Sequence, residues 1–278
     1  MSQPVGFQGH KSSCRTMNNR DMSENVEKFT GRVAAYAEYR ERYDAGVVLP
    51  LLRDWCGLLP EWTVADIGAG TGMLSDVFLA GGNRVIAVEP NAEMRQACAE
   101  LHEGNSQLSL LNGTAEATGL EDASVEMVSV GRALHWFDIE LAIREFRRIL
   151  KPDGWVTVIA FGRSKDGREE NEAYEEFLRP FTANGLGTRV QYAKYERLED
   201  LFADGEYRRA EVPGEFRLGW DALRGLTLSL SHAPLPGTAE FGAFEEALQR
   251  YFVRHEKNGC VTLTTRYWVS VGRFGNRV

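Results

Sequence analysis

The sequence predicts an α/β protein built on a doubly wound, mostly parallel sheet of seven strands, with a helical lid after the fifth strand. Three observations lead to this prediction. Short apolar runs alternate with helical patterns from residue 61 to 162, which is typical of strand–helix–strand units. The first run ends in a glycine turn. The alternation then breaks after Phe161, where long charged and amphipathic stretches begin.

The five core strands are predicted from apolar runs bounded by turn residues. The second run is apolar throughout its middle, as expected for a parallel strand covered on both faces. The predicted strands are 64–68, 84–89, 107–111, 125–130 and 155–161. Three helices are predicted between these strands. The first begins near Gly72, the second ends near His102 and the third runs over 139–150. Pro152 and Gly154 are expected to stop the third helix.

Before this core, residues 24–60 show a helical spacing of apolar residues and are predicted to form an N-terminal helical cover. A second helix in this cover is predicted over 45–58, with Pro50 inside it or near its start. The cover either packs on the core alone or places Tyr36, Tyr39 and Arg40 over the glycine turn. Residues 1–23 contain no acidic residue before Asp21 and no apolar core, and we expect a disordered tail there.

After the core, residues 163–256 are predicted to be partly an inserted lid or substrate region. Helices are expected over 165–183, 220–230 and 239–254, and a strand over 207–218. Residues 261–274 are rich in β-branched and aromatic side chains, so residues 257–278 are predicted to supply the terminal strand of the core sheet.

Composition excludes several classes of function. The 278 residues carry a formal net charge of −8, which disfavours nucleic acid as a partner. No apolar run approaches the roughly 20 residues of a membrane span. The four cysteines are far apart and lack metal-ligand spacing, so we expect free thiols, no metal and a cytoplasmic protein.

The glycine turn indicates which class of ligand the protein binds. Gly68, Gly70 and Gly72 leave no side chain between the backbone and a ligand, and a helix opening near Gly72 would direct free N–H groups to the same point. Met73 stands where a dinucleotide fingerprint has its third glycine, and Asp66 would repel a pyrophosphate. Glu89, 21 positions after Gly68, suits both hydroxyls of a ribose. A ligand with a ribose and a positive charge but no phosphate is indicated, and S-adenosylmethionine has these properties.

Five motifs resemble the class I S-adenosylmethionine-dependent methyltransferases, in particular the small-molecule group related to the trans-aconitate and ubiquinone/menaquinone enzymes. They are VADIGAGTG (64–72), VIAVEPNAEM (85–94), NGTAEATGL (112–120), GRALHWFD (131–138) and RILKPDGWV (148–156). The resemblance implies a Rossmann-like fold, S-adenosyl-L-methionine as cofactor and S-adenosyl-L-homocysteine as product.

The resemblance also implies which residues hold the cofactor. Residues around the methionine and ribose would be Asp66, Gly68, Ala69, Gly70, Gly72 and Glu89. Asp66 would orient the turn and act, directly or through water, on the ammonium group. Those around the adenine would be Pro90, Met94, Thr114, Ala115 and Glu116. Thr114 stands where many relatives have Asp, and the stretch 115–118 has the alternative of an ordinary surface loop.

The loop after the fourth strand is expected to face the transferable methyl group. Arg132 would meet the cofactor carboxylate or an acidic substrate, or else form a surface salt bridge. His135 is a candidate general base, with a loop-holding role as the alternative. Trp136 offers a π face to the sulfonium, or packing. His232, in a later proline-rich loop, is a weaker substrate candidate of the same kind.

These features predict a methyltransferase that aligns a small acceptor with the methyl group for in-line displacement, without a catalytic triad. O-methylation of a carboxylate or a hydroxyl is the expected reaction. The Asn/Asp-Pro-Pro-Tyr/Phe motif of DNA-modifying relatives is absent after the fourth strand, where Ala133–Trp136 stand. The alternatives are a protein acceptor, a non-catalytic S-adenosylmethionine-binding protein, and a nicotinamide oxidoreductase, which Met73 and Asp66 disfavour.

Overall fold

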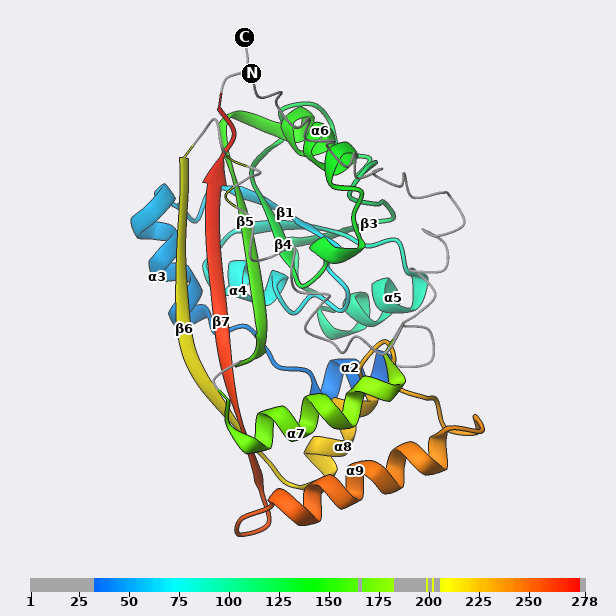
Figure 1. Ribbon diagram of the computed structural model, residues 1–278. Helices are drawn as coiled ribbons and strands as arrows, with labels where there is room; N and C mark the ends of the chain where they lie inside the picture. Colours follow the sequence, from blue (N-terminus) through cyan, green and yellow to red (C-terminus); the bar gives the residue numbers. More distant parts are fainter. Residues whose placement is uncertain (1–32, 165–166, 183–198, 200–201, 203–205, 276–278) are drawn as a thin grey trace, which may run out of the picture.

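A computed structural model describes residues 33–164, 167–182, 199, 202 and 206–275. Its centre is a seven-stranded sheet with the order β3-β2-β1-β4-β5-β7-β6 (Figure 1). Strands β1 to β5 run parallel to one another. Strand β7 runs antiparallel to both β5 and β6. The predicted fold class, with seven strands that are mostly parallel, is confirmed.

The element bounds follow the sequence pattern closely. The strands are β1 (Thr63–Ile67), β2 (Arg84–Val88), β3 (Leu108–Leu111), β4 (Val125–Gly131), β5 (Leu150–Arg163), β6 (Glu206–Leu218) and β7 (Val261–Arg273). The helices are α2 (Val33–Tyr39), α3 (Ala45–Cys56), α4 (Ser75–Ala80), α5 (Ala92–Leu101), α6 (Ile139–Ile149), α7 (Glu169–Leu178), α8 (Trp220–Leu228) and α9 (Phe241–His255), with short 3-10 turns at Leu134–Trp136 and Arg179–Phe181.

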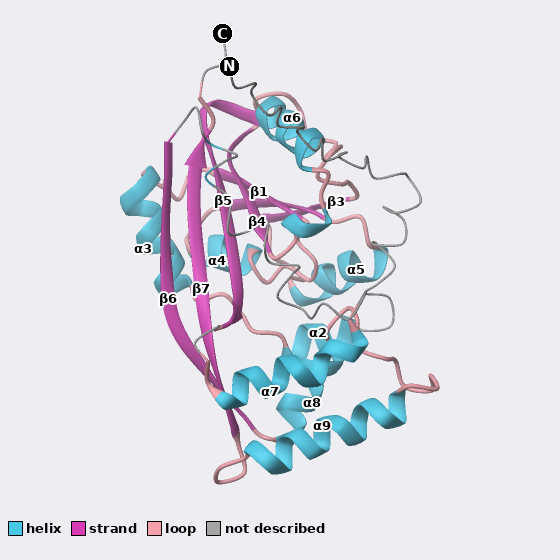
Figure 2. Cartoon of the chain, in the orientation of Figure 1, coloured by secondary structure: helices cyan, strands magenta, loops and turns pink. Residues whose placement is uncertain are grey.

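The parallel strands are buried on both faces because alternate residues feed two apolar layers. In β1, Val64 joins the layer that contains α3 and α4, whereas Ala65 and Ile67 join the layer that contains α6. Helices therefore cover the sheet on both faces (Figure 2). The carboxyl ends of β1, β2 and β4 are left to the loops, which is where a ligand binds in such sheets.

One boundary near the glycine turn was predicted wrongly. The helix expected from about Gly72 begins at Ser75 as α4, and has only six residues. Gly68, Gly70 and Gly72 have φ angles of +69°, +60° and +86°, in the left-handed region that a right-handed helix cannot contain. The helix can therefore begin only after the last of these glycines, and it does not offer a long helix N-terminus to the ligand.

A second correction concerns β5, which was expected to start at Trp155 but starts at Leu150. Leu150 pairs with Val125, and the pairing resumes with Trp155 beside Met127, so the residues between form an irregularity in the strand. Asp153 within it has a φ of +64°. The Pro and Gly of this stretch end α6 as expected, but they produce a bulge instead of a separate loop.

The helices after β5 form their own apolar layer beside the lower ends of β6 and β7 in Figure 1. Strand β6 falls inside the region 163–256 that was predicted to be partly inserted, yet it pairs with β7 along its whole length. Helix α2 packs on α8, where the Tyr39 ring lies directly against Gly225. The N-terminal cover and the later helices thus contact one another.

Several predictions lie outside the described residues, including the tail 1–23, the first part of the cover and the ends of the helix predicted over 165–183. Within the described part of the chain, no helix has both the length and the apolar character needed to cross a membrane.

Candidate cofactor site

The glycine turn after β1 makes its own hydrogen bonds. Gly68 and Ala69 donate their amides to the Val88 carbonyl oxygen at the end of β2, at 2.9 and 3.2 Å. Gly72 donates to the Ala69 carbonyl oxygen at 2.9 Å. These amides are therefore already paired and fix the turn, instead of pointing at an anion.

The glycines differ in what surrounds them. A Cβ on Gly68 would lie 2.6 Å from Ala133, and one on Gly72 would lie 2.6 Å from the His102 ring. A Cβ on Gly70 would meet nothing within 4 Å. Gly68 and Gly72 are thus required by packing as well as by φ, whereas Gly70 borders open space and forms the accessible part of the cradle.

Glu89 joins this turn to β2. Its Oε2 accepts from the Gly70 amide at 2.8 Å and its Oε1 accepts from the Asn91 amide at 2.8 Å. Burial raises the pKa of this carboxyl group, and the two amides partly offset the shift. A carboxylate offers about four acceptor positions, so each oxygen keeps capacity for one more donor. Two neighbouring hydroxyls, as on a ribose, match that remaining capacity.

Asp66 occupies a different environment. Its carboxylate is fully buried and accepts hydrogen bonds from the hydroxyls of Ser75, at 2.7 Å, and Ser129, at 3.1 Å. Burial is the main cause that raises its pKa to about 6. The side chain ties β1 to the start of α4 and to β4. It therefore orients the turn, and in this structure it has no surface with which to touch a ligand.

The residues predicted around the adenine lie in and after the loops of β2 and β3. Met94 is buried in the first turn of α5, where its amide donates to the Asn91 side chain at 2.9 Å, and Pro90 precedes that cap. The Thr114 hydroxyl accepts from the Ala117 amide at 3.2 Å. Ala115 is buried in the layer around α6.

Glu116 fastens this loop to the start of α6, where its Oε1 accepts from the Asp138 amide at 2.9 Å. The residues predicted from sequence for the adenine are thus brought to two adjacent loops, after β2 and after β3. Their contact with a nucleoside stays a prediction.

Arg132, directly after β4, is buried and has a φ of +54°. Its Nη1 donates to the Glu41 carboxylate at 2.8 Å, and its Nη2 donates to the Glu41 carbonyl oxygen at 3.1 Å. Nη2 also lies 3.6 Å from the sulfur of Met73, the residue that follows the glycine turn. The ion pair is therefore buried beside the turn and not on the surface.

His135 and Trp136 lie in the 3-10 turn that follows Arg132 and are half-buried. Their rings are 4.5 Å apart and tilted by 45°. The next residue, Phe137, lies close to Gly68. The structure thus brings the loop after β4 against the glycine turn. The expected position of this loop at the transferable methyl group and the role of His135 stay predictions.

Residues 40–44, here called the strap, connect α2 to α3 and contact both α8 and α4. Arg40 donates to the Ser229 carbonyl oxygen at 3.3 Å, so it contacts the end of α8. Arg42 pairs with Asp76 of α4 at 3.0 Å. The side chain of Tyr36, predicted to lie over the turn, is outside the described part of the structure.

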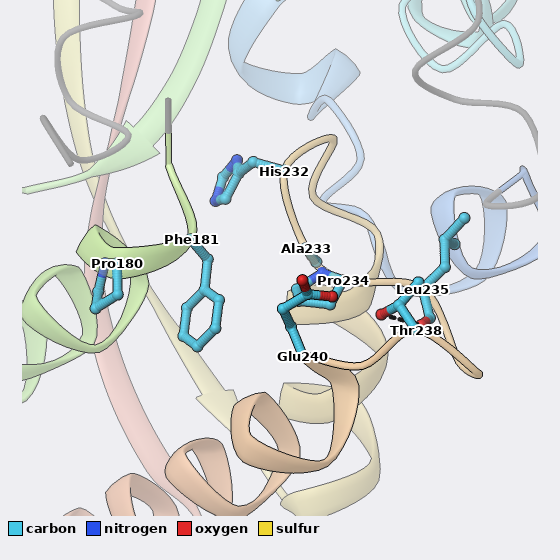
Figure 3. Close-up of a pocket in the computed structure, with 8 residues that line it drawn as sticks. All are labelled: Pro180, Phe181, His232, Ala233, Pro234, Leu235, Thr238 and Glu240. Carbon is cyan, nitrogen blue, oxygen red and sulfur yellow. Dashed lines mark hydrogen bonds between the residues drawn. The ribbon is translucent and has the colours of Figure 1, made fainter. Parts of the chain in front are cut away.

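His232 lines a cavity of about 380 Å³ in the helical region (Figure 3). Phe181 and Pro180 face it across the gap, and Pro234, Leu235 and Glu240 complete much of the wall. Among the described residues, none from the glycine turn or from the loop after β4 lines this cavity. His135 and His232, both predicted near the acceptor, thus belong to two separate parts of the molecule.

Sequence reasoning missed three residues that shape the site. The Asn91 side chain caps α5, and its backbone amide donates to Glu89. An Asn three residues before Met94 is a recognisable helix N-cap signal in the sequence. His102 donates to Asp76 at 2.8 Å beneath Gly72, and this partner raises its pKa to about 10. Glu41 had no signal in the local pattern, because its partner is 91 positions away.

Comparison with known proteins supports the interpretation of the core. Residues 65–158 match the family model described as a methyltransferase domain. An uncharacterized methyltransferase of Mycobacterium tuberculosis is 39% identical over 141 residues, covering 50% of this chain and 53% of that protein. The chain thus matches about half the length of this relative.

Two further relatives match over shorter stretches. The ubiquinone/menaquinone biosynthesis C-methyltransferase of Rubrivivax gelatinosus is 32% identical over 99 residues, covering 35% of this chain and 39% of that protein. A malonyl-[acyl-carrier protein] O-methyltransferase of Erwinia pyrifoliae is 36% identical over 94 residues, covering 34% of this chain and 35% of that protein.

Two solved structures share the fold. The YcgJ protein from Bacillus subtilis covers 82% of this chain and 98% of its own, with a TM-score of 0.54 and 18% identity. The [4+2]-cyclase SpnF covers 92% of this chain and 97% of its own, with a TM-score of 0.52 and 13% identity. Residues 65–158 of the chain therefore resemble a methyltransferase domain, and the chain shares its fold with these two structures.

Proposed function

We propose that this protein binds S-adenosylmethionine and transfers its methyl group to an oxygen of a small molecule. One observation carries the proposal. The amide of the central glycine, Gly70, donates to the Glu89 carboxylate, so the turn presents a negative group at its accessible point. A ribose hydroxyl is attracted to that carboxylate and a phosphate is repelled by it.

The paired amides of the turn support the same ligand. A dinucleotide-binding turn needs free backbone N–H groups for its pyrophosphate. Here Gly68, Ala69 and Gly72 donate to carbonyl oxygens, and Gly70 donates to Glu89. These four pairings favour a nucleoside without phosphates over NAD.

S-adenosylmethionine, when bound, supplies an activated methyl group on a positively charged sulfur. The chain then has to hold an acceptor in line with that group and exclude water. Glu89 would fix the ribose, the turn would fix the methionine end, and the loop with His135 and Trp136 would border the methyl group. An ionised carboxylate acceptor needs no base, whereas a hydroxyl acceptor would use His135 to take its proton.

The acceptor itself is the finer part of the proposal. One relative is described as a C-methyltransferase and another as an O-methyltransferase, and each matches about a third of this chain, so this likeness does not select the acceptor atom. We place the acceptor beside the loop with His135 and Trp136, because in-line transfer requires its reacting atom to lie next to the methyl group. The His232 cavity, which no described residue of that loop lines, is not assigned to the acceptor. We propose a small organic acid or hydroxyl compound, acted on in the cytoplasm.

The test is a screen of small acids, phenols and amines with S-adenosylmethionine labelled in the methyl group. We expect label in an acid or a phenol, together with one equivalent of S-adenosylhomocysteine. Label only in amines, or only in added proteins, would contradict the proposed acceptor class. Binding of S-adenosylhomocysteine with no transfer to any acceptor would favour a non-catalytic binding protein, a reminder that the fold also occurs in a structure described as a cyclase.

A further inference from the structure

We propose that Glu41 and Arg132 together recognise the amino-acid group of the cofactor, with Arg132 facing its carboxylate and Glu41 facing its ammonium. The inference rests on the proposed function, because it assumes S-adenosylmethionine in the glycine cradle. It assigns a binding role to Glu41, which lies outside the methyltransferase domain match at residues 65–158.

The position of the pair supports this role. Arg132 follows directly after β4, at the carboxyl end of the sheet, and its Nη2 lies 3.6 Å from the sulfur of Met73. Met73 follows Gly72, so the guanidinium lies at the end of the turn. The methionine end of a nucleoside whose ribose is held at Glu89 has to extend along this turn, between the β1 and β4 loops.

The charges of the pair match the ligand. An amino-acid group carries one carboxylate and one ammonium close together, and a buried Arg–Glu pair carries the opposite charges at similar separation. The two side chains are only 7% and 11% exposed, so their charges are weakly screened by water. A buried ion pair gains little for stability on its own, because desolvation offsets the attraction. A role in recognising a zwitterion gives this pair a reason to be buried beside the turn.

The other acidic residues near the turn are engaged elsewhere, and one of them, Asp76, pairs with His102 and Arg42. Asp66 is fully buried and accepts from the hydroxyls of Ser75 and Ser129. Glu89 accepts from the amides of Gly70 and Asn91 at the end of β2. Among the described carboxylates of the site, Glu41 is therefore the one placed with Arg132 at the far end of the turn, where the ammonium would lie.

The strap holds Glu41 in place from both sides. Arg40 donates to the end of α8, and Arg42 pairs with Asp76 of α4. The Tyr43 ring lies under the Arg132 guanidinium at 5.2 Å, and the Asp44 amide donates to the Tyr267 hydroxyl at 2.8 Å. A carboxylate that is positioned before binding loses little entropy when the ligand arrives.

The experiment compares two ligands by calorimetry on the full chain. S-adenosylhomocysteine has the amino-acid group, and 5′-methylthioadenosine keeps the adenine, ribose and thioether but lacks it. We expect Glu41→Gln and Arg132→Gln each to weaken the binding of S-adenosylhomocysteine about tenfold or more, since each substitution removes a charge-assisted hydrogen bond to the ligand. Binding of 5′-methylthioadenosine should change by less than about twofold, because its contacts at Glu89 are intact.

Glu175→Gln is the matched control. Glu175 pairs with Arg163 at 2.6 Å, and both side chains are buried to a similar degree as the proposed pair. This variant should leave the ratio of the two affinities unchanged. If Glu41→Gln alone does not fold, the double variant Glu41→Gln/Arg132→Met removes both charges and should show the same loss for S-adenosylhomocysteine.

The outcomes separate this inference from the proposed function. Equal weakening of both ligands in Glu41→Gln, or no weakening of either, would overturn the role of the pair. Failure of the unmodified chain to bind either ligand would instead overturn the proposed function itself.

Discussion

The glycine turn and the helical region after β5 are stabilised in different ways. Around the turn, buried carboxylates, paired amides and left-handed glycines fix the backbone, and a single residue change alters a defined contact. In the helical region, an aromatic cluster fills the interior, with Tyr174, Phe177, Phe244 and Tyr251 at its centre. The first region constrains one ligand closely, whereas the second tolerates many side chains of similar volume. The glycine turn therefore supports a specific cofactor proposal, whereas the helical region constrains the acceptor less.

The largest expected effect distinguishes two left-handed glycines in these regions. Gly72→Ala places a Cβ 2.6 Å from the His102 ring at a φ of +86°, whereas Gly237→Ala has a φ of +91° and no atom within 4 Å. We expect Gly72→Ala to lower the free energy of unfolding by about 3 kcal/mol or more, and Gly237→Ala by about 1–2 kcal/mol from backbone strain alone. Urea denaturation measures both. Equal losses would mean that packing under the turn is looser than described.

Loss of the Glu89 carboxylate should have the next largest effect. Glu89→Ala removes the acceptor of two amides and of the expected ribose hydroxyls. We expect binding of S-adenosylhomocysteine to weaken about a hundredfold. The control is Glu103→Gln, an exposed carboxylate beyond the end of α5, which should leave the affinity unchanged. If Glu89→Ala binds S-adenosylhomocysteine as tightly as the unmodified chain, Glu89 does not bind the ribose.

The two regions also differ in how far the sequence predicted them. Apolar runs predicted the five parallel strands, because parallel strands are buried on both faces, whereas β-branched and aromatic content predicted β7. Placement of ligand-binding loops at the carboxyl ends of the strands was predicted, and the structure adds that Gly68 lies against Ala133 of the loop after β4. The start of α4 was predicted too early, because helix propensity does not take account of three glycines with left-handed φ angles. Glu41 was missed because its role depends on a partner far along the chain.

A smaller effect concerns pH and Asp66, whose pKa is raised by burial to about 6. A carboxyl group with a raised folded pKa destabilises the fold when ionised, so its cost is fully present above pH 6 and disappears as the pH falls toward 4. Asp66→Asn should therefore raise the melting temperature at pH 8, by about 2 °C or more, and not at pH 4. Thermal denaturation at the two pH values tests this. A melting temperature lowered at pH 8 would show that the ionised carboxylate stabilises the turn.

The smallest expected effect concerns His135. If the acceptor is a carboxylate, no base is needed, and His135→Ala should lower kcat by less than about tenfold by loosening the loop. The measurement is the rate of methyl transfer to the acceptor found in the screen, across the pH range 6–9. A fall of about a hundredfold or more, with loss of a pH-dependent step, would make His135 the base and the acceptor a hydroxyl.

The central claim is that the glycine turn binds a nucleoside without phosphates. Calorimetric titration of the full chain with S-adenosylhomocysteine and, separately, with NAD tests it most directly. We predict saturable one-to-one binding of S-adenosylhomocysteine and no binding of NAD at the same concentrations, because the amides of Gly68, Ala69, Gly70 and Gly72 are already paired and cannot hold a pyrophosphate. Binding of NAD without binding of S-adenosylhomocysteine would contradict the account.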